Sequence, residues 1–414
     1  MRINFRLPAI ALSVLACGVF FATQHSSAQT QIQPGQVIIS ELRFSGPGGA
    51  EDEFIELYNN TNQDIVVQST DGSPGWAVAI SNGQITGNLF VIPNGTLIRA
   101  RGHFLGANTN GYSLSGYPSG PAPVPSPTPF LGTTPDAGYD FDIPAGSGVA
   151  LFSTTFGTAQ TAARRLDAFG FTSSPALFRE GSGFPFVPSG LGETTLFRDM
   201  RTTGGLPKDT NDNAADFLFA ATTQSVSTAN SFLLGAPGPE NLASPVLHNS
   251  DIAIGLLDPA APPAAVPNRE RRPNVEPNAD LGSLLIRRTF TNNTGQAVTR
   301  LRFRVINITG PGTENTCGGT LCADVRALTS QDGEAGSPNI GVVTVRGVRL
   351  EEPPLQPNGG GFNSSLSADF ITLATPLQPG QSVPIQFKLG IMRNGAFRFF
   401  FNIEASTAPP IVIN

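Results

Sequence analysis

The chain has 414 residues, a net charge of −6 and a pI of about 5.2, so the basic surface of a general nucleic-acid binder is not expected. Gly and Pro account for 46 and 36 residues, and Lys208 and Lys388 are the only lysines, whereas Phe, Val, Ile and Thr are plentiful. This composition disfavours helices and suits many short strands joined by turns. We therefore expect an all-β, weakly anionic protein, and its length predicts two or three domains.

Residues 1–28 have the layout of a secretory signal peptide. Arg2 and Arg6 give a positive start, an apolar run covers residues 7–21, and small residues at 26–28 form an exit site. The run is shorter than the roughly 20 residues of a transmembrane helix. We expect export to the medium or the cell surface, with no transmembrane segment after signal removal.

The three cysteines carry two further expectations. A cut before Cys17 would make a lipoprotein, but Leu15 is bulky for the small residue required there. After export, Cys317 and Cys322 are the only possible intramolecular pair, and we expect a disulfide in an oxidising compartment. Because the closed ring is small, its entropic contribution is only about 2 kcal/mol. A metal site is the alternative, but it needs more ligands than these two thiols.

Residues 36–243 alternate short apolar runs with turn clusters, which predicts a first β-sandwich. The segment 116–135 is rich in Pro, Ser, Thr and Gly, and we expect an exposed insertion there. Short helices are expected only near 162–164 and 214–216. The expected strands lie at 36–42, 53–58, 65–67, 76–80, 89–92, 97–98, 103–105, 148–152 and 166–171.

A linker-like passage at 235–239 closes this first region. Strand patterns return over residues 249–414, and their spacing and turns predict a second β-sandwich. No internal repeat suggests a solenoid or a propeller. The expected strands lie at 251–257, 301–306, 341–345, 385–389 and 397–401.

The first region resembles the lamin tail domain, an immunoglobulin-like β-sandwich found in nuclear lamins and in many bacterial secreted proteins. The resemblance is carried by Val-Ile-Ile-Ser-Glu-Leu at 37–42 and Asp-Glu-Phe-Ile-Glu-Leu-Tyr-Asn at 52–59. Weaker matches follow at 148–152, 166–170 and 209–217, and the Pro-rich insertion departs from the compact pattern. The resemblance implies a non-enzymatic interaction module.

Catalytic groups are scarce in this sequence. A serine-hydrolase triad needs a histidine near its serine, but only His103 and His248 follow the signal segment, and no Gly-x-Ser-x-Gly elbow occurs. Glu41, Glu53 and Glu56, on adjacent predicted strands, are the candidates for a glycosidase-type carboxylate pair. Since Glu53 and Glu56 are three apart on a strand, they face opposite sides, and a solvated or turn-capping role is the favoured interpretation.

The acidic loop at 209–216 is the candidate calcium site. Calcium takes six to eight oxygen ligands, which several side chains of this loop could supply. The loop lacks the central Gly and terminal Glu of the helix-loop-helix calcium motif, and Asx-turn and N-cap roles explain its composition equally well. The candidate ligands are Asp209, Asn211, Asp212, Asn213 and Asp216.

Arginines on the second region form a possible anion-binding strip. Arg302 and Arg304 alternate with Phe303 and Val305, so one strand face is basic and the other apolar. A solvent-exposed strand face, whose charged side chains prevent aggregation between sheets, has the same pattern. The residues of this strip that we single out are Arg287, Arg288, Arg302 and Arg304.

The sequence thus favours a secreted or cell-surface, non-enzymatic binding or structural protein of the adhesion type. The expected partner is a protein or polysaccharide at the cell surface, with no cofactor other than possible calcium. Two alternatives stay open. One is an extracellular polymer hydrolase that uses an unrecognised carboxylate pair. The other is an extracellular DNA-binding module that uses the arginine strip.

Overall fold

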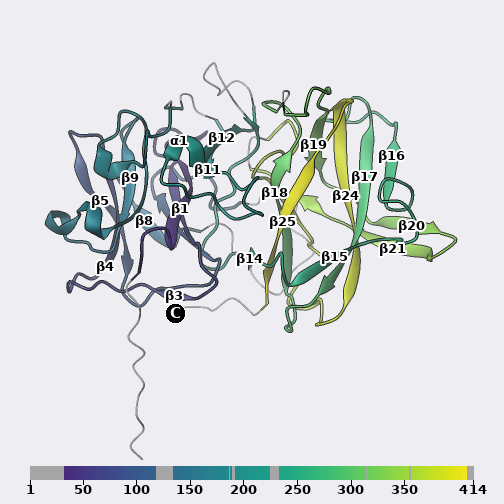
Figure 1. The fold of residues 1–414 in the computed structure, drawn as a ribbon, viewed down its shortest axis with the longest axis horizontal. Helices are drawn as coiled ribbons and strands as arrows, with labels where there is room; N and C mark the ends of the chain where they lie inside the picture. The colour runs from purple at the N-terminus through teal and green to yellow at the C-terminus, as the bar shows by residue number, and fades with distance from the viewer. Residues whose placement is uncertain are drawn as a thin grey trace, which may run out of the picture. The chain divides into compact units, whose positions relative to one another are not determined.

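Strands dominate the chain from Val37 to Ser406 (Figure 1). The computed structural model describes residues 32–117, 134–185, 187–188, 192–223, 233–313, 316–353 and 356–407. Within these ranges the expected all-β class is confirmed, and helices are limited to η1 (Gly157–Ala159), η2 (Ala162–Arg164), η3 (Ala176–Phe178) and α1 (Asn213–Asp216). Two of them, η2 and α1, coincide with the short helices expected from the sequence. The signal segment, Cys17 and most of the Pro-rich insertion lie outside the described residues.

Two sheets and a short strand pair form the first half of the described chain. A seven-stranded sheet has the order β13-β12-β11-β1-β2-β7-β8, and a four-stranded sheet has the order β10-β9-β4-β5. The strands of the first sheet are β1 (Val37–Arg43), β2 (Phe54–Asn59), β7 (His103–Asn108), β8 (Ala137–Tyr139), β11 (Thr194–Arg198), β12 (Phe217–Ala221) and β13 (Leu233–Leu234). Those of the second are β4 (Gly75–Ser81), β5 (Thr86–Pro93), β9 (Gly148–Phe152) and β10 (Arg165–Phe169), while β3 (Ile65–Val66) pairs with β6 (Leu97–Ile98).

Two further sheets form the second half. One has the order β14-β25-β18-β23-β22. The other has the order β15-β17-β24-β21-β20, with β16 paired to β17 and β19 paired to β24. The strands of the first are β14 (Val246–Leu247), β18 (Arg300–Ile308), β22 (Arg349–Leu350), β23 (Ser365–Ser367) and β25 (Phe399–Ser406). Those of the second are β15 (Ile252–Leu256), β16 (Arg269–Arg272), β17 (Ser283–Asn292), β19 (Asp324–Leu328), β20 (Gly333–Ser337), β21 (Gly341–Gly347) and β24 (Ser382–Arg393).

Phenylalanines fill the core between these last two sheets. Phe303 of β18 lies 4.9 Å from both Phe290 of β17 and Phe387 of β24, measured between ring centroids, and 5.2 Å from Phe401 of β25. Such tilted and edge-on contacts add to the stabilisation from burying apolar surface. The alternation expected along β18 is confirmed, because Phe303 and Val305 are fully buried in this core. The neighbouring arginines therefore point to the opposite face of the sheet.

The same five-residue turn occurs once in each half of the chain. Asn-Asn-Thr-x-Gln stands at 59–63, after β2, and at 292–296, at the end of β17. In both copies the buried Asn side chain accepts hydrogen bonds from the N–H and the hydroxyl of the Thr two residues later. The amide also donates to the Gln carbonyl and to a carbonyl of a returning segment, at Ile98 in one copy and Leu377 in the other. Each turn thereby ties the end of a strand, β2 or β17, to a segment distant in sequence.

From Gln33 onward the chain forms one compact unit. One apolar core includes Phe197, Ala220 and Leu233 from the first half together with most of the apolar side chains of the second half. The separation into domains 36–243 and 249–414 remains a prediction. Among the described residues no helix has both the length and the apolar character needed to cross a bilayer.

Candidate functional site

Two of the candidate carboxylates, Glu41 and Glu56, lie opposite each other on β1 and β2. The register of this strand pair shifts between Ile39 and Glu41, as at a β-bulge, which re-aims a side chain. Glu41 and Glu56 are each only 2% exposed. The expected solvated or turn-capping role is therefore wrong for both residues.

Each of these carboxylates accepts specific hydrogen bonds. Glu56 accepts from the Ser40 hydroxyl at 2.5 Å and from the Glu240 N–H at 2.6 Å. Glu41 accepts from the Thr195 hydroxyl at 2.6 Å, from the Gly238 N–H at 2.9 Å and from the Asn363 amide at 2.9 Å. Because Asn363 belongs to the second half of the chain, Glu41 is one of the links between the two halves.

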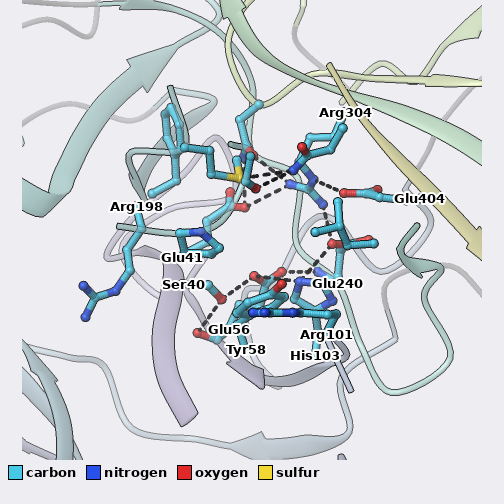
Figure 2. A pocket seen from close by; sticks show the side chains of 17 residues that line it. Ser40, Glu41, Glu56, Tyr58, Arg101, His103, Arg198, Glu240, Arg304 and Glu404 are labelled. Carbon is cyan, nitrogen blue, oxygen red and sulfur yellow. Dashed lines mark hydrogen bonds and ion pairs between the residues drawn. The ribbon is translucent and has the colours of Figure 1, made fainter. Parts of the chain in front are cut away.

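Arg302 and Arg304 of β18 lie close to these carboxylates, as Figure 2 shows for Arg304. Glu404 of β25 lies directly across from Arg302 in the sheet, and its carboxylate accepts from Arg302 Nε at 2.8 Å and from Arg304 Nε at 2.9 Å. Arg304 also donates to the side-chain oxygen of Asn363 at 2.7 Å. The two arginines are only 4% and 5% exposed, so the wet-face interpretation of this part of the strip is wrong.

Glu240 completes the cluster, and sequence reasoning missed it. Its carboxylate lies 2.6 Å from Arg304 Nη2, 3.1 Å from His103 Nε2, and in close contact with Arg302. The preceding segment, which the sequence suggested as a linker, is buried, and Ala236 donates its N–H to the carbonyl of Phe362 at 3.0 Å. The general signal for a linker, Pro and Gly without apolar periodicity, does not distinguish an exposed connection from a buried one.

Acidic groups outnumber basic ones in this charge cluster, which we define as Glu41, Glu56, His103, Glu240, Arg302, Arg304, Glu351 and Glu404. Burial, and then the negative charge of Glu41, raises the pKa of Glu56 well above its ordinary value. Burial, followed by the charges of Arg304 and Arg302, lowers the pKa of His103, so the imidazole stays neutral. Burial opposes ionisation of Glu404 too, but the two arginines outweigh it and hold its pKa below the ordinary value.

The space left inside the charge cluster is small. A cavity of about 40 Å³ is lined by Glu41, Glu56, His103, Glu240 and Arg304, among others (Figure 2). A cavity of this size holds a few waters, since one water requires on the order of 10–15 Å³ of such volume. A polymer chain does not fit between these carboxylates as they stand.

One subset of the charge cluster has the spacing of a metal ligand set. Ligand atoms of Glu56, His103 and Glu240 lie within 4.8 Å of one another. A histidine with two carboxylates is a usual set for a divalent transition metal. Glu240, however, is already paired with Arg302 and Arg304, and these cations oppose a metal in the same place.

Glu53 occupies a separate environment, as expected for a position facing away from Glu56. Its carboxylate accepts from the Ile143 N–H at 2.9 Å and from the Asn108 amide at 3.2 Å. The residue is fully buried, so the expected solvated or turn-capping role is wrong for Glu53 as well. Burial raises its pKa to about 8, against the lowering effect of these two hydrogen bonds.

The side chains of the 209–216 loop point to different partners. Asn213 accepts from the N–H groups of Gly170 and Glu180, and Asp212 accepts from Ser182. Asp216 accepts from the N–H and the hydroxyl of Thr210, and Asn211 has a positive φ of 59°. Most of these contacts join the loop to residues distant in sequence, and none of them is the bond to an N–H two residues later that defines an Asx-turn.

Asp209 belongs instead to a second buried cluster around Arg198. Arg198 donates to both oxygens of Asp167 at 2.8 Å, and its other nitrogen lies 3.4 Å from Asp209. Ligand atoms of Asp167, Glu180 and Asp209 lie within 4.8 Å of one another. Burial, and then the charge of Asp167, raises the pKa of Glu180 to about 9. Of the five candidate calcium ligands, only Asp209 belongs to this ligand-spaced trio, and Asp216 meets the cluster through Arg198 Nη1 at 3.6 Å.

Arg287 and Arg288 lie on a different sheet from Arg302 and Arg304. Arg287 is buried and donates to the Gln386 side chain at 2.7 Å and to Glu270 at 2.5 Å. Arg288 is half-buried and donates to the carbonyls of Asn268 and Arg287. The four arginines singled out from the sequence therefore do not form one continuous strip.

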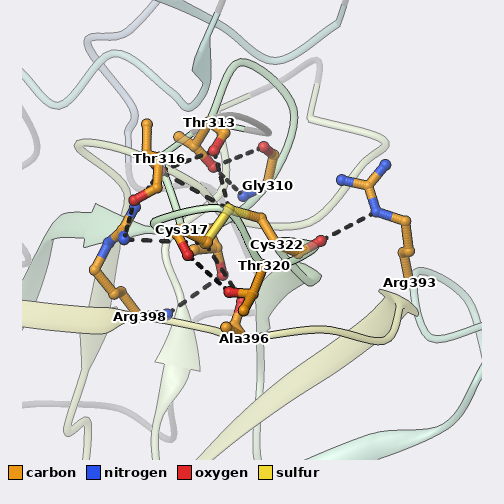
Figure 3. Close-up of a disulfide and its surroundings, with 10 residues drawn as sticks. Gly310, Thr313, Thr316, Cys317, Thr320, Cys322, Arg393, Ala396 and Arg398 are labelled. Carbon is orange, nitrogen blue, oxygen red and sulfur yellow. Dashed lines mark hydrogen bonds between the residues drawn. A yellow bond between two sulfur atoms is a disulfide. The ribbon is translucent and has the colours of Figure 1, made fainter.

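The disulfide expected between Cys317 and Cys322 is present (Figure 3). It closes a loop that packs against the β24–β25 connection, where Ala396 donates its N–H to the Leu321 carbonyl at 2.9 Å. His248 makes a local contact, with Nδ1 2.9 Å from the Asp251 carboxylate. His103, in contrast, is buried in the charge cluster.

The fold and the charge cluster thus define an all-β chain with a polar centre that joins strands of its two halves. Comparison with known protein families found no family model that matches the chain. A comparison with curated proteins found no match either.

Proposed function

We propose that this chain is a secreted or cell-surface, non-enzymatic binding and structural protein of the adhesion type. The observation that supports it best is that the acid, base and cationic side chains of the centre bond to one another across β1, β2, β7, β18 and β25. Groups held in this way fix two halves of a chain in one arrangement, which a rigid binding scaffold requires.

The proposal includes a lamin-tail-like, immunoglobulin-like sandwich over residues 36–243, followed by a second β-sandwich. The segments that carry the resemblance fall on β1, β2, β9, β10 and the loop that contains α1. Domains of this kind serve as interaction modules, so the proposed partner is a protein or polysaccharide at the cell surface. The disulfide is compatible with an oxidising, extracellular compartment.

Binding of the purified chain to the producing organism's own cells tests this function. We expect saturable retention that survives washing, and a heat-unfolded sample of the same chain is the control. Repeating the assay with a calcium chelator tests the 209–216 loop, with Asp209→Asn as the matched variant. Absence of saturable retention in both conditions would contradict the adhesion-type function.

An extracellular hydrolase is the second candidate, and one observation favours it. Glu56 and Glu404 have pKa values displaced in opposite directions within one cluster, which is the usual signature of an acid and base pair. A hydrolase that uses Glu56 would release reducing ends from extracellular polysaccharides and lose that activity in Glu56→Gln. Release abolished in this variant, with the fold intact, would replace the adhesion-type function by the hydrolase.

Extracellular DNA binding was the other alternative. The buried position of Arg302 and Arg304 weighs against it, because phosphates are contacted by accessible guanidinium groups. Salt-dependent retention on DNA at low ionic strength would revive it.

A further inference from the structure

A second, larger cavity lies beside the disulfide loop, away from the charge cluster. Its volume is about 280 Å³, whereas a single water requires on the order of 10–15 Å³ of such space. Strand β16 and the connection from β24 to β25 supply its polar walls, and Leu284 and Val325 are among its apolar walls. The polar side chains that line it are Arg269, Arg271 and Asn394, next to the ring of Phe397.

Arg269 and Asn394 are the polar groups that remain available in this cavity. Within the described part of the chain the Arg269 guanidinium has no hydrogen bond or ion pair, and its recorded contact is the face of Phe397, 5.8 Å from the ring centroid. The Asn394 side chain is exposed and likewise makes no hydrogen bond to described residues. A half-buried, unpaired guanidinium beside an apolar wall has five N–H donors to offer to a ligand.

Other arginines near the cavity add positive charge without a carboxylate partner among the described residues. Arg271 donates to the carbonyls of Arg272, Ser283 and Leu281. Arg393 and Arg398, at either side of the lining segment 394–397, donate to the Cys322 carbonyl and to Thr316 respectively (Figure 3). A chain with a net charge of −6 thus gathers at this place several arginines that have no carboxylate partner among the described residues, which favours an anionic ligand.

The disulfide loop holds one wall of the cavity in position. Ala396, next to the lining residue Phe397, donates to the Leu321 carbonyl at 2.9 Å and accepts from the Ala323 N–H at 2.8 Å. The Cys317–Cys322 bond restrains the loop that contains Leu321. A pre-formed wall of this kind reduces the ordering cost of ligand binding.

We propose that this cavity binds a carboxylate-bearing sugar ring, such as a uronic acid residue of an acidic polysaccharide. The inference rests on the proposed binding function and names its ligand class. The planar fork of Arg269 matches the two oxygens of a carboxylate. The Asn394 amide both donates and accepts, as a sugar hydroxyl requires, and the apolar walls pack against the ring. A phosphate is a poorer match, because it calls for several free donors and Arg269 is the one free guanidinium among the described lining residues.

Calorimetric titration of the purified chain with a galacturonic acid trimer tests this proposal. The comparison ligands are the methyl-esterified trimer, inorganic phosphate and a short poly-glutamate peptide. We expect the free trimer to bind, and Arg269→Gln to weaken it about ten- to a hundredfold through loss of a charge-assisted pair. The matched control is Arg272→Gln, on the same strand but outside the lining, which removes the same charge and leaves the affinity unchanged.

The thermal midpoint of each variant shows whether it is folded. Asn394→Ala, at an exposed position, gives a second test of the same cavity. Equal affinity of the ester and the acid, unchanged affinity in Arg269→Gln and Asn394→Ala, or preference for phosphate or the peptide would each overturn the proposal. If the chain is retained on cells but binds no trimer, the uronic acid ligand is wrong and the adhesion-type function stands. If neither binding is seen, both fail.

Discussion

The glutamates of this protein differ in pKa according to the groups that surround them. Glu404 faces two guanidinium groups and has a lowered pKa, whereas burial and the negative charge of Glu41 raise the pKa of Glu56 against the lowering effect of the hydrogen bond from Ser40. The strand pattern of the sequence correctly predicted Glu41 and Glu56 on adjacent strands. The same pattern predicted that both side chains are exposed to solvent. Glu240 and the arginines that cover them are distant in sequence, so no local pattern could predict that they lie close by.

Removing Arg304 is expected to be among the most destabilising single changes. Arg304→Met leaves the carboxylates of Glu240 and Glu404 short of a partner in a buried place, and we predict a loss of about 3–5 kcal/mol in the free energy of unfolding. Urea denaturation measures it. The control is Arg272→Ala, which breaks the more exposed pair with Glu270 and should cost less than about 1 kcal/mol. Similar losses in the two variants would show that the charge cluster contributes no more than a surface pair.

The raised pKa of Glu53 predicts a stability that falls as the pH rises. Its pKa is about 8 in the folded chain and 4.5 when unperturbed, so between these values the folded state holds a proton that the unfolded state releases. The stabilisation is complete below pH 4.5 and disappears as the pH rises through 8. In Glu53→Gln the decrease between pH 5 and 9 should be smaller by on the order of 3 kcal/mol, since one pKa unit corresponds to about 1.4 kcal/mol. Urea titrations across this range check it, and an unchanged slope would contradict it.

At the level of elements, local sequence patterns predicted the strands and helices whose structure depends on neighbouring residues alone. The strand expected at 148–152 and the two expected short helices were found in place. Strands β11 and β12 were missed, because their sequences lack a clear alternation and both of their faces are largely buried. The apolar alternation in β18 predicted its core face correctly but could not say what covers the other face.

The repeated Asn-Asn-Thr-x-Gln turn permits a matched test in the two halves. Asn59→Ala removes five hydrogen bonds of a buried side chain, and Asn292→Ala removes four. We predict a loss of about 2–4 kcal/mol for each, because several hydrogen bonds of about 0.5–1.5 kcal/mol are lost together. Asn293→Ala, at an exposed neighbouring position, should change stability by less than about 0.5 kcal/mol. Chemical denaturation compares the three, and a cost confined to one half would show that the two turns are not equivalent.

At the scale of the whole molecule, the buried polar centre and the shared apolar core act together. Glu41 binds Asn363, Glu240 binds Arg304, and Phe197 and Leu233 belong to the same core as Phe303. None of these contacts is local in sequence, so composition and periodicity could predict the all-β class but not the joining of the halves. The sequence suggested a linker at 235–239, where the chain is in fact buried between its own strands.

The central claim is that the charge cluster joins the two halves into one structural unit, and differential scanning calorimetry of the purified chain tests it most directly. We predict one unfolding transition for the described unit, with a calorimetric enthalpy equal to the van't Hoff enthalpy, and a separation into two transitions in Arg304→Met. Two separate transitions in the unmodified chain would contradict the claim, because each half would then unfold without the other.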